Sequence, residues 1–91
     1  MRVHIASPLL SYTGQQPVVE ARGSNIGQML EDLDRQFPGM RFRIVDEQDK
    51  LRPYIRVFVN RVQWMRLDAA LQDSDEIHIL QALAGADPHR R

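Results

Sequence analysis

The residues best suited to chemistry lie near the end of the chain, in the run QALAGA of residues 81–86. This run follows a strand-like segment, and its side chains become progressively smaller. Because glycine and alanine let a partner's walls approach the backbone closely, such a terminus can enter a narrow cleft of another protein. The alternative is an ordinary frayed terminus, which is common at the ends of domains. The composition of residues 81–86 alone favours the frayed terminus. The order of the predicted elements and the spacing from the last strand favour instead a carboxyl end that another protein modifies at Gly85 and Ala86.

The chain lacks the residue sets of an enzyme, so no catalytic residue is expected. It shows no Ser, His and carboxylate set, no phosphate-binding glycine loop and no paired-acid motif. It has no cysteine, which excludes disulfides, thiolate nucleophiles and cysteine zinc sites. His4, His78 and His89 lack the spacing of a metal-binding helix, so we expect neither a metal nor a cofactor. We expect His4 and His78 to be surface neighbours on two parallel strands.

The overall charge of the chain does not indicate a class of binding partner. Twelve Lys and Arg balance twelve Asp and Glu, so no overall field attracts nucleic acid or an anionic membrane. A basic face for RNA is the alternative, carried by Arg41, Arg43, Arg52, Arg56, Arg61 and Arg66. Acidic residues interleave with these arginines, at Asp46, Glu47, Asp49 and Asp68, and favour an ordinary solvated surface. The N-terminus enters a strand pattern at once, which makes a cytoplasmic location the default.

The first half of the 91-residue chain predicts a hairpin and a helix. Residues 2–10 alternate as a strand that loosens at Pro8, and residues 18–22 form a second short strand. Asn25 provides an N-cap with Gln28 three residues later, and Pro38-Gly39 ends the helix. The apolar stripe that faces a sheet consists of Ile26, Met29, Leu30, Leu33 and Phe37. Gly27 only weakens the first turn of this helix, by about 0.5 to 1 kcal/mol relative to alanine.

The second half predicts strands around an irregular connection. Residues 40–53 are expected to be irregular, with at most one short strand. Residues 54–59 form the strongest strand, and Asn60-Arg61 turns it into residues 62–65. The last strand, residues 76–80, points Ile77 and Ile79 inward. The fold class is α+β, a β-grasp or ubiquitin-like mixed sheet of four to five strands with one main helix packed across it. Its first and last strands should pair in parallel at the centre.

Several segments together resemble the MoaD/ThiS family of ubiquitin-like sulfur-carrier proteins, particularly its members in cysteine synthesis and the small archaeal modifiers. These segments are RPYIRVFVN at residues 52–60, LQDSDEIHIL at 71–80, ALAGA at 82–86, SNIG at 24–27 and FPG at 37–39. The match spans nearly the whole chain. The order and spacing of the segments carry the resemblance, because each one alone is a weak signal.

The resemblance implies a carrier, not a catalyst. An ATP-dependent activating enzyme would adenylate the terminal carboxylate, and sulfur would then replace one oxygen to give a thiocarboxylate that a sulfur-accepting synthase consumes. Leu80 and Leu83 would be docking contacts beside the tail. Trp64 is either a further partner contact or a lid on the edge of the core, and we give slightly more weight to the lid.

The chain departs from the family pattern at its end. The family finishes in two glycines, whereas this chain has Gly85-Ala86 followed by residues 87–91. We therefore expect a domain with its tail at residues 1–86 and an extension at 87–91 that a protease removes before activation. The alternative is a degenerate β-grasp interaction module, which is not activated because Ala86 replaces the second glycine. A smaller departure is Arg61, which follows Asn60 in the turn.

Overall fold

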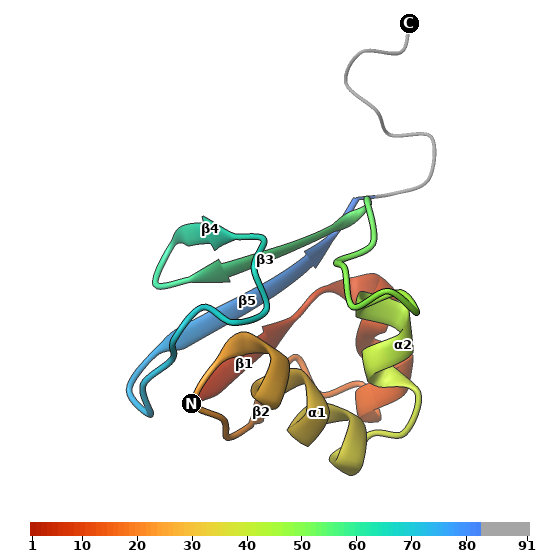
Figure 1. Ribbon diagram of the computed structural model, residues 1–91. Coiled ribbons are helices and arrows are strands. Elements are labelled where there is room, and N and C mark those ends of the chain that lie inside the picture. The colour runs from red at the N-terminus through yellow and green to blue at the C-terminus, as the bar shows by residue number, and fades with distance from the viewer. Residues whose placement is uncertain (83–91) are drawn as a thin grey trace, which may run out of the picture.

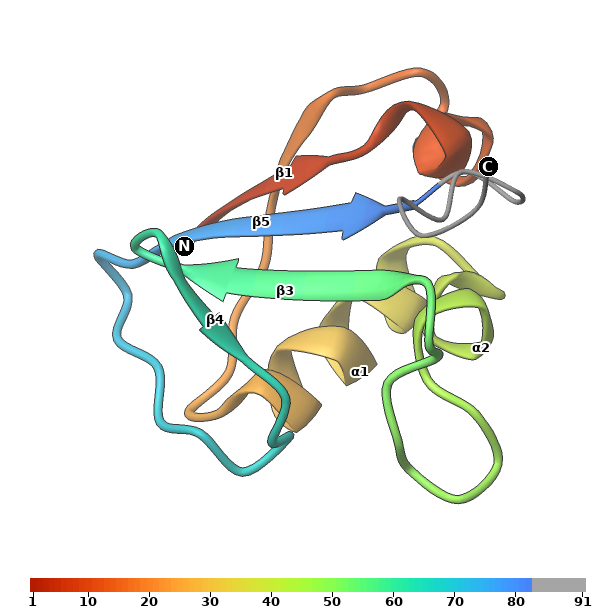
Figure 2. The ribbon, with the colours of Figure 1, turned by 90° about the horizontal axis from the view of Figure 1, so that it is seen from above.

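The computed structural model describes residues 1–82 as a five-stranded sheet with helices on one side (Figure 1). The elements in chain order are β1 (Arg2–Ile5), the 3-10 helix η1 (Ser7–Thr13), β2 (Val18–Glu20), α1 (Ile26–Gln36), α2 (Met40–Ile44), β3 (Ile55–Val59), β4 (Val62–Trp64) and β5 (Glu76–Gln81). The strand order is β2-β1-β5-β3-β4, and Figure 2 shows β5 lying between β1 and β3. The predicted β-grasp arrangement is confirmed.

The two ends of the domain meet at the centre of the sheet, as predicted. Strand β1 pairs with β5 in parallel, with Val3 opposite Ile77 and Ile5 opposite Ile79. Ile77 and Ile79 are fully buried, so the predicted inward face of β5 is confirmed. Parallel pairing is available because the intervening chain forms a long crossover. Strand β5 is also antiparallel to β3, so both of its edges are hydrogen-bonded.

Helix α1 begins where its capping residues predict. The Asn25 side chain accepts a hydrogen bond from the Gln28 backbone N–H at 2.8 Å, which satisfies one of the free donors of the first turn. The Gln28 side chain in turn accepts from the Ser24 backbone N–H. The apolar stripe is buried at Ile26, Met29, Leu30 and Leu33, whereas Phe37 is the half-buried C-cap. The helix therefore packs its stripe into the core under the sheet.

The prediction of one strand over residues 2–10 is wrong beyond Ile5. The chain enters η1 at Ser7, with Pro8 in its first turn, where a missing N–H costs nothing. Leu9 is fully buried and holds this turn against the core. At the other end, the Thr13 hydroxyl donates to the backbone carbonyls of Leu10 and Gln16. Residues 2–10 resemble a strand because Leu9, which is buried in η1, continues the odd-numbered apolar pattern of Val3 and Ile5.

The prediction of an irregular segment over residues 40–53 is wrong at its start, where the chain forms α2. A carboxylate oxygen of Asp34, on the preceding helix, accepts from the backbone N–H groups of Gly39 and Arg41 at 3.1 Å each. Met40 and Ile44, one helical turn apart, are both fully buried. The possible short strand amounts to one isolated bridge between Val45 and Leu51.

The predicted hairpin of β3 and β4 is confirmed. Asn60 and Arg61 have φ angles of 49° and 75°, the left-handed pair that a two-residue turn of this hand requires. The Asn60 side chain also donates to Asp75 at 2.8 Å and accepts from the Glu76 backbone N–H at 3.0 Å. The turn is thereby tied to the start of β5, and the Arg61 side chain is held at this end of the sheet.

Candidate functional site

The last described residue leaves the sheet from its central strand. Strand β5 ends at Gln81, and the Ala82 backbone N–H donates to the Tyr54 carbonyl at 2.8 Å. Whatever follows is attached to the best-anchored strand of the domain. Leu83, Gly85 and Ala86, the predicted docking and activation residues, lie outside the described residues.

The sheet has one face turned away from α1 and α2, here called the outer face (Figure 2). One row of side chains crosses all five strands on it, because each residue pairs directly with the next: Val18, His4, His78, Phe58 and Gln63. Side chains directly opposite one another in a sheet share a face. The row combines apolar and imidazole groups and crosses β5 at His78, in the middle of that strand.

The structure separates the two predicted docking residues that it describes. Leu80 is 44% exposed and pairs with Arg56 on the outer face. Trp64 is 40% exposed and pairs with Val57, which is fully buried on the helix side. Trp64 therefore lies on the opposite face of the sheet, on the edge strand β4. Of these two residues, only Leu80 lies on the outer face.

The predicted meeting of His4 and His78 is confirmed. Their rings stack in parallel with centroids 4.1 Å apart and an interplanar angle of 3°. His4 Nε2 donates to Glu76 Oε1 at 2.6 Å, and Arg2 forms an ion pair with the other oxygen at 3.5 Å. Within residues 1–82, no group of three or more His, Cys, Asp or Glu is placed to hold a metal ion. The pair is part of a surface network.

This network shifts two pKa values in the same direction. The hydrogen bond from His4 lowers the pKa of Glu76 below its ordinary 4.5, with Arg2 adding to the effect. Desolvation lowers the pKa of His78 below its ordinary 6.5, and the adjacent His4 and Arg61 act in the same sense while Glu76 opposes them. His78 therefore stays neutral at a pH where a free histidine gains a proton.

The folded protein should accordingly lose stability on mild acidification. As the pH falls through 6.5, His78 in the unfolded chain takes up a proton that the folded chain resists, so the free energy of unfolding decreases. Urea unfolding between about pH 5 and pH 8 measures this. His78→Gln should flatten the dependence in that window but retain the loss below 4.5, which belongs to Glu76. An unchanged slope near neutrality in this variant contradicts the assignment.

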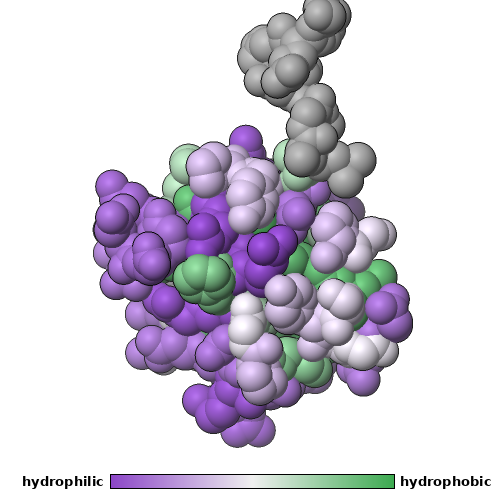
Figure 3. Space-filling view, turned by 90° about the vertical axis from the view of Figure 1, so that its right-hand side faces the viewer, coloured by the Kyte–Doolittle hydropathy of each residue, from purple (hydrophilic) through white to green (hydrophobic). Residues whose placement is uncertain are grey.

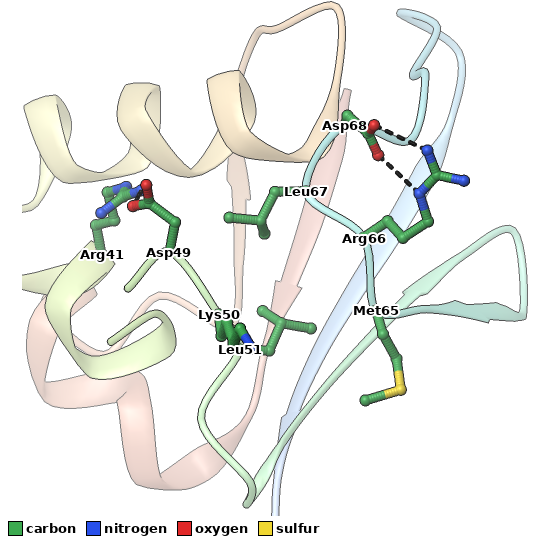
Figure 4. Close-up of a pocket in the computed structure, with 8 residues that line it drawn as sticks. All are labelled: Arg41, Asp49, Lys50, Leu51, Met65, Arg66, Leu67 and Asp68. Atoms are coloured by element: carbon green, nitrogen blue, oxygen red, sulfur yellow. Dashed lines mark hydrogen bonds and ion pairs between the residues drawn. The ribbon is translucent and has the colours of Figure 1, made fainter. Parts of the chain in front are cut away.

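A groove opens on the helix side, between the chain before β3 and the loop after β4 (Figure 4). Its volume is about 630 Å³, and its lining residues are Arg41, Asp49, Lys50, Leu51, Met65, Arg66, Leu67 and Asp68. Arg41 pairs with Asp49 at 3.0 Å, and Arg66 binds both oxygens of Asp68 at 3.0 and 2.9 Å. The predicted neutralisation of arginines by interleaved acids is confirmed at these pairs, so the groove offers no strong anion site.

The side of the molecule that carries α2 is also mostly polar. Hydrophilic residues cover most of this face, and hydrophobic ones are scattered in small groups (Figure 3). Exposed Phe42, on α2, lies under the Arg52 guanidinium at 4.6 Å from the ring centroid. None of the helices in residues 1–82 is long and apolar enough to cross a membrane. Scattered apolar groups of this kind are normal for a protein surface.

The comparisons with known proteins agree with this architecture. The ThiS family matches residues 3–85. The sulfur carrier protein CysO of Mycobacterium tuberculosis is 33% identical over 88 residues, which cover 91% of this chain and 95% of that protein. A crystal structure of the Amycolatopsis orientalis BexX/CysO complex contains a chain with a TM-score of 0.86 and 33% identity, over 92% of this chain and 97% of that one.

A more distant relative shares the same fold. The solution structure of the small archaeal modifier protein 1 from Methanosarcina acetivorans has a TM-score of 0.77 and 25% identity, covering 92% of this chain and 93% of that chain. The predicted resemblance to sulfur carriers in cysteine synthesis and to archaeal modifiers is thereby confirmed. With the family match spanning nearly its whole length, the chain belongs to the ThiS family.

Proposed function

We infer that this chain is a sulfur carrier that serves as the substrate of other enzymes. The observation that carries the proposal is the position of β5: the central strand of a ThiS-family sheet ends at Gln81, four residues before Gly85 in the sequence. Because the strand is rigid, an enzyme that binds the residues after it loses little orientational entropy in positioning them. Because activation consumes ATP, the proposal also places the protein in the cytoplasm.

The chemistry follows from carboxylate activation. A protease first cleaves after Ala86, which separates the domain of residues 1–86 from the extension 87–91. An oxygen of the new carboxylate then attacks the α-phosphorus of ATP in the activating enzyme and releases pyrophosphate. Hydrosulfide from the sulfur donor attacks the acyl carbon of the adenylate and displaces AMP, and loss of the remaining S–H proton leaves a thiocarboxylate for a sulfur-accepting synthase. This chain supplies the carboxylate and the docking surface, and no catalytic residue.

Intact mass spectrometry tests the proposal. The full chain and a chain ending at Ala86 are incubated with the cognate activating enzyme, ATP and a sulfur donor. The shortened chain should gain the mass difference between sulfur and oxygen, because its reacting carboxylate is free. The full chain should change only after a protease has removed residues 87–91. If the shortened chain keeps its mass while the enzyme thiocarboxylates another ThiS-family carrier, the sulfur-carrier function is wrong.

One observation favours a second function, that of an interaction module that is no longer activated. Ala86 stands where the family carries its last glycine, and a methyl group there narrows the fit of the tail in the enzyme. Under this alternative the outer face still binds a partner, but the terminus undergoes no chemistry. Partner binding by the shortened chain without any mass change distinguishes the module from the carrier.

A further inference from the structure

The outer face has a shallow pocket that runs along β5, from the β3–β4 turn at the start of this strand to Leu80, and the carrier chemistry does not explain it. Its lining residues are Phe58, Arg61, His78 and Leu80, and its volume is about 350 Å³. It is here called the Arg61 pocket. Phe58 lies directly opposite His78 across the β3–β5 pairing, and Leu80 follows two residues later on the same face. The pocket therefore has an apolar floor with one permanent cation at its rim.

Arg61 is placed there by the backbone of the turn. Its φ of 75° and the hydrogen bonds of the adjacent Asn60 hold this residue at the tip of the β3–β4 hairpin. Within residues 1–82, the Arg61 guanidinium has no hydrogen bond or ion pair, whereas Arg2, Arg41 and Arg66 are each paired with an acid. A guanidinium presents several donors suited to a carboxylate. Arg61 is thus available to a group from outside the chain.

The neighbouring charges leave the pocket positive. Glu76, on the same face, is engaged by His4 and Arg2. His78 stacks on His4, and its lowered pKa keeps it neutral near pH 7. It therefore lines the pocket with an uncharged polar ring. An apolar floor beside an unpaired guanidinium is complementary to a carboxylate that is carried next to aliphatic groups.

The position of the pocket limits which protein can supply that carboxylate. His78, the pocket residue of β5 that lies on the side of Arg61, is eight residues before Ala86, and eight extended residues span at most about 29 Å. An enzyme that holds the terminal carboxylate in its reactive site therefore has its own surface within reach of the Arg61 pocket. Nucleic acid fits less well, because the chain has no net charge and binding to a phosphate backbone needs several unpaired cations.

We propose that the Arg61 pocket receives a glutamate or aspartate side chain of the activating enzyme and thereby selects this carrier. This proposal rests on the proposed function, and it names the contact by which the activating enzyme recognises the domain. Arg61 acts in recognition, at a distance from the reacting atoms. Loss of the contact should therefore change KM for the carrier and leave kcat unchanged.

Pyrophosphate release by the cognate activating enzyme, measured against the concentration of chain 1–86, tests the proposal. Arg61→Glu should raise KM by about 10- to 100-fold, since it replaces a charge-assisted hydrogen bond by repulsion. Arg61→Lys should retain most of the affinity because it keeps the charge. Arg35→Glu is the matched control: it makes the same charge change on α1, on the other side of the sheet, and should leave KM unchanged. Urea unfolding verifies that each variant is folded.

Rescue identifies the partner residue. Reversing the charge of acidic residues in the enzyme, one at a time within about 29 Å of its adenylation site, should yield one variant that restores activity with Arg61→Glu. Normal KM for Arg61→Glu overturns the pocket assignment and leaves the carrier function intact. Weaker binding of single-stranded RNA by Arg61→Glu with an unchanged KM overturns it as well. An enzyme that never adenylates the parent chain contradicts the carrier function, and the inferred occupant with it.

Discussion

Replacing Ala86 by glycine in a chain that ends at residue 86 is expected to raise kcat/KM for adenylation by about 5- to 150-fold. The reason is steric and rests on the proposed function: a channel that fits the terminal glycine of the family should be overpacked by a methyl group beside the reacting carboxylate, and overpacking costs about 1 to 3 kcal/mol. The measurement is the rate of pyrophosphate release by the cognate activating enzyme at several concentrations of carrier.

Ala84→Gly provides the matched control for this effect. It removes the same methyl group two residues farther from the carboxylate, so its gain in kcat/KM should be smaller. Equal rates for the parent terminus and the Ala86→Gly variant would mean that the channel of the cognate enzyme has room for a methyl group. Activity of the Ala86→Gly variant alone, with a silent native terminus, would instead assign the chain to the interaction module.

The parts of the fold that were predicted from sequence are those in which burial follows a regular period. The stripe of α1 and the alternation of β5 each repeat over several turns or residues, and the capping of Asn25 is local. Helix α2 was missed because its first turn is capped by Asp34 from the preceding helix, a contact that no short window of sequence displays.

Gly27 shows the same dependence on tertiary contacts. Its sequence context indicated only a weak point in the first turn of α1. In the structure its backbone N–H donates to the Leu67 carbonyl at 2.7 Å, and a Cβ atom at this position would lie 3.4 Å from that oxygen. Such a distance is an ordinary van der Waals contact, so the link between α1 and the loop after β4 is the hydrogen bond of the Gly27 backbone. The identity of the distant partner could not be predicted without the fold.

The candidate site was predictable only where strand pairing alone determines it. His4 and His78 follow from parallel pairing of the first and last strands in the observed register. The separation of Leu80 from Trp64 requires the registers of both the β3–β5 and β3–β4 pairs, because a shift by one residue moves a side chain to the other face. The Arg61 pocket further depends on the positive φ angle of the turn, so it became visible only in three dimensions.

Ile79→Ala should produce the largest loss of stability among the changes considered, about 2 to 5 kcal/mol. Ile79 is fully buried on the central strand, where it lies opposite Ile5 and Val57. Truncation removes apolar contacts from both neighbouring strands at once, and a domain of this size has only about 5 to 15 kcal/mol of total stability. Urea unfolding followed by circular dichroism measures the difference in midpoint and in free energy.

The adjacent residue provides a control that separates stability from recognition. Leu80→Ala removes an aliphatic side chain from the same strand, but 44% of Leu80 is exposed on the outer face, so its effect on the free energy of unfolding should be markedly smaller. Its effect should instead be a higher KM for the activating enzyme, because Leu80 lines the Arg61 pocket. Similar free energies of unfolding for the two variants would contradict the assignment of Ile79 and Leu80 to opposite faces of the sheet. They would also contradict the proposal that an activating enzyme contacts the outer face while it holds the terminus.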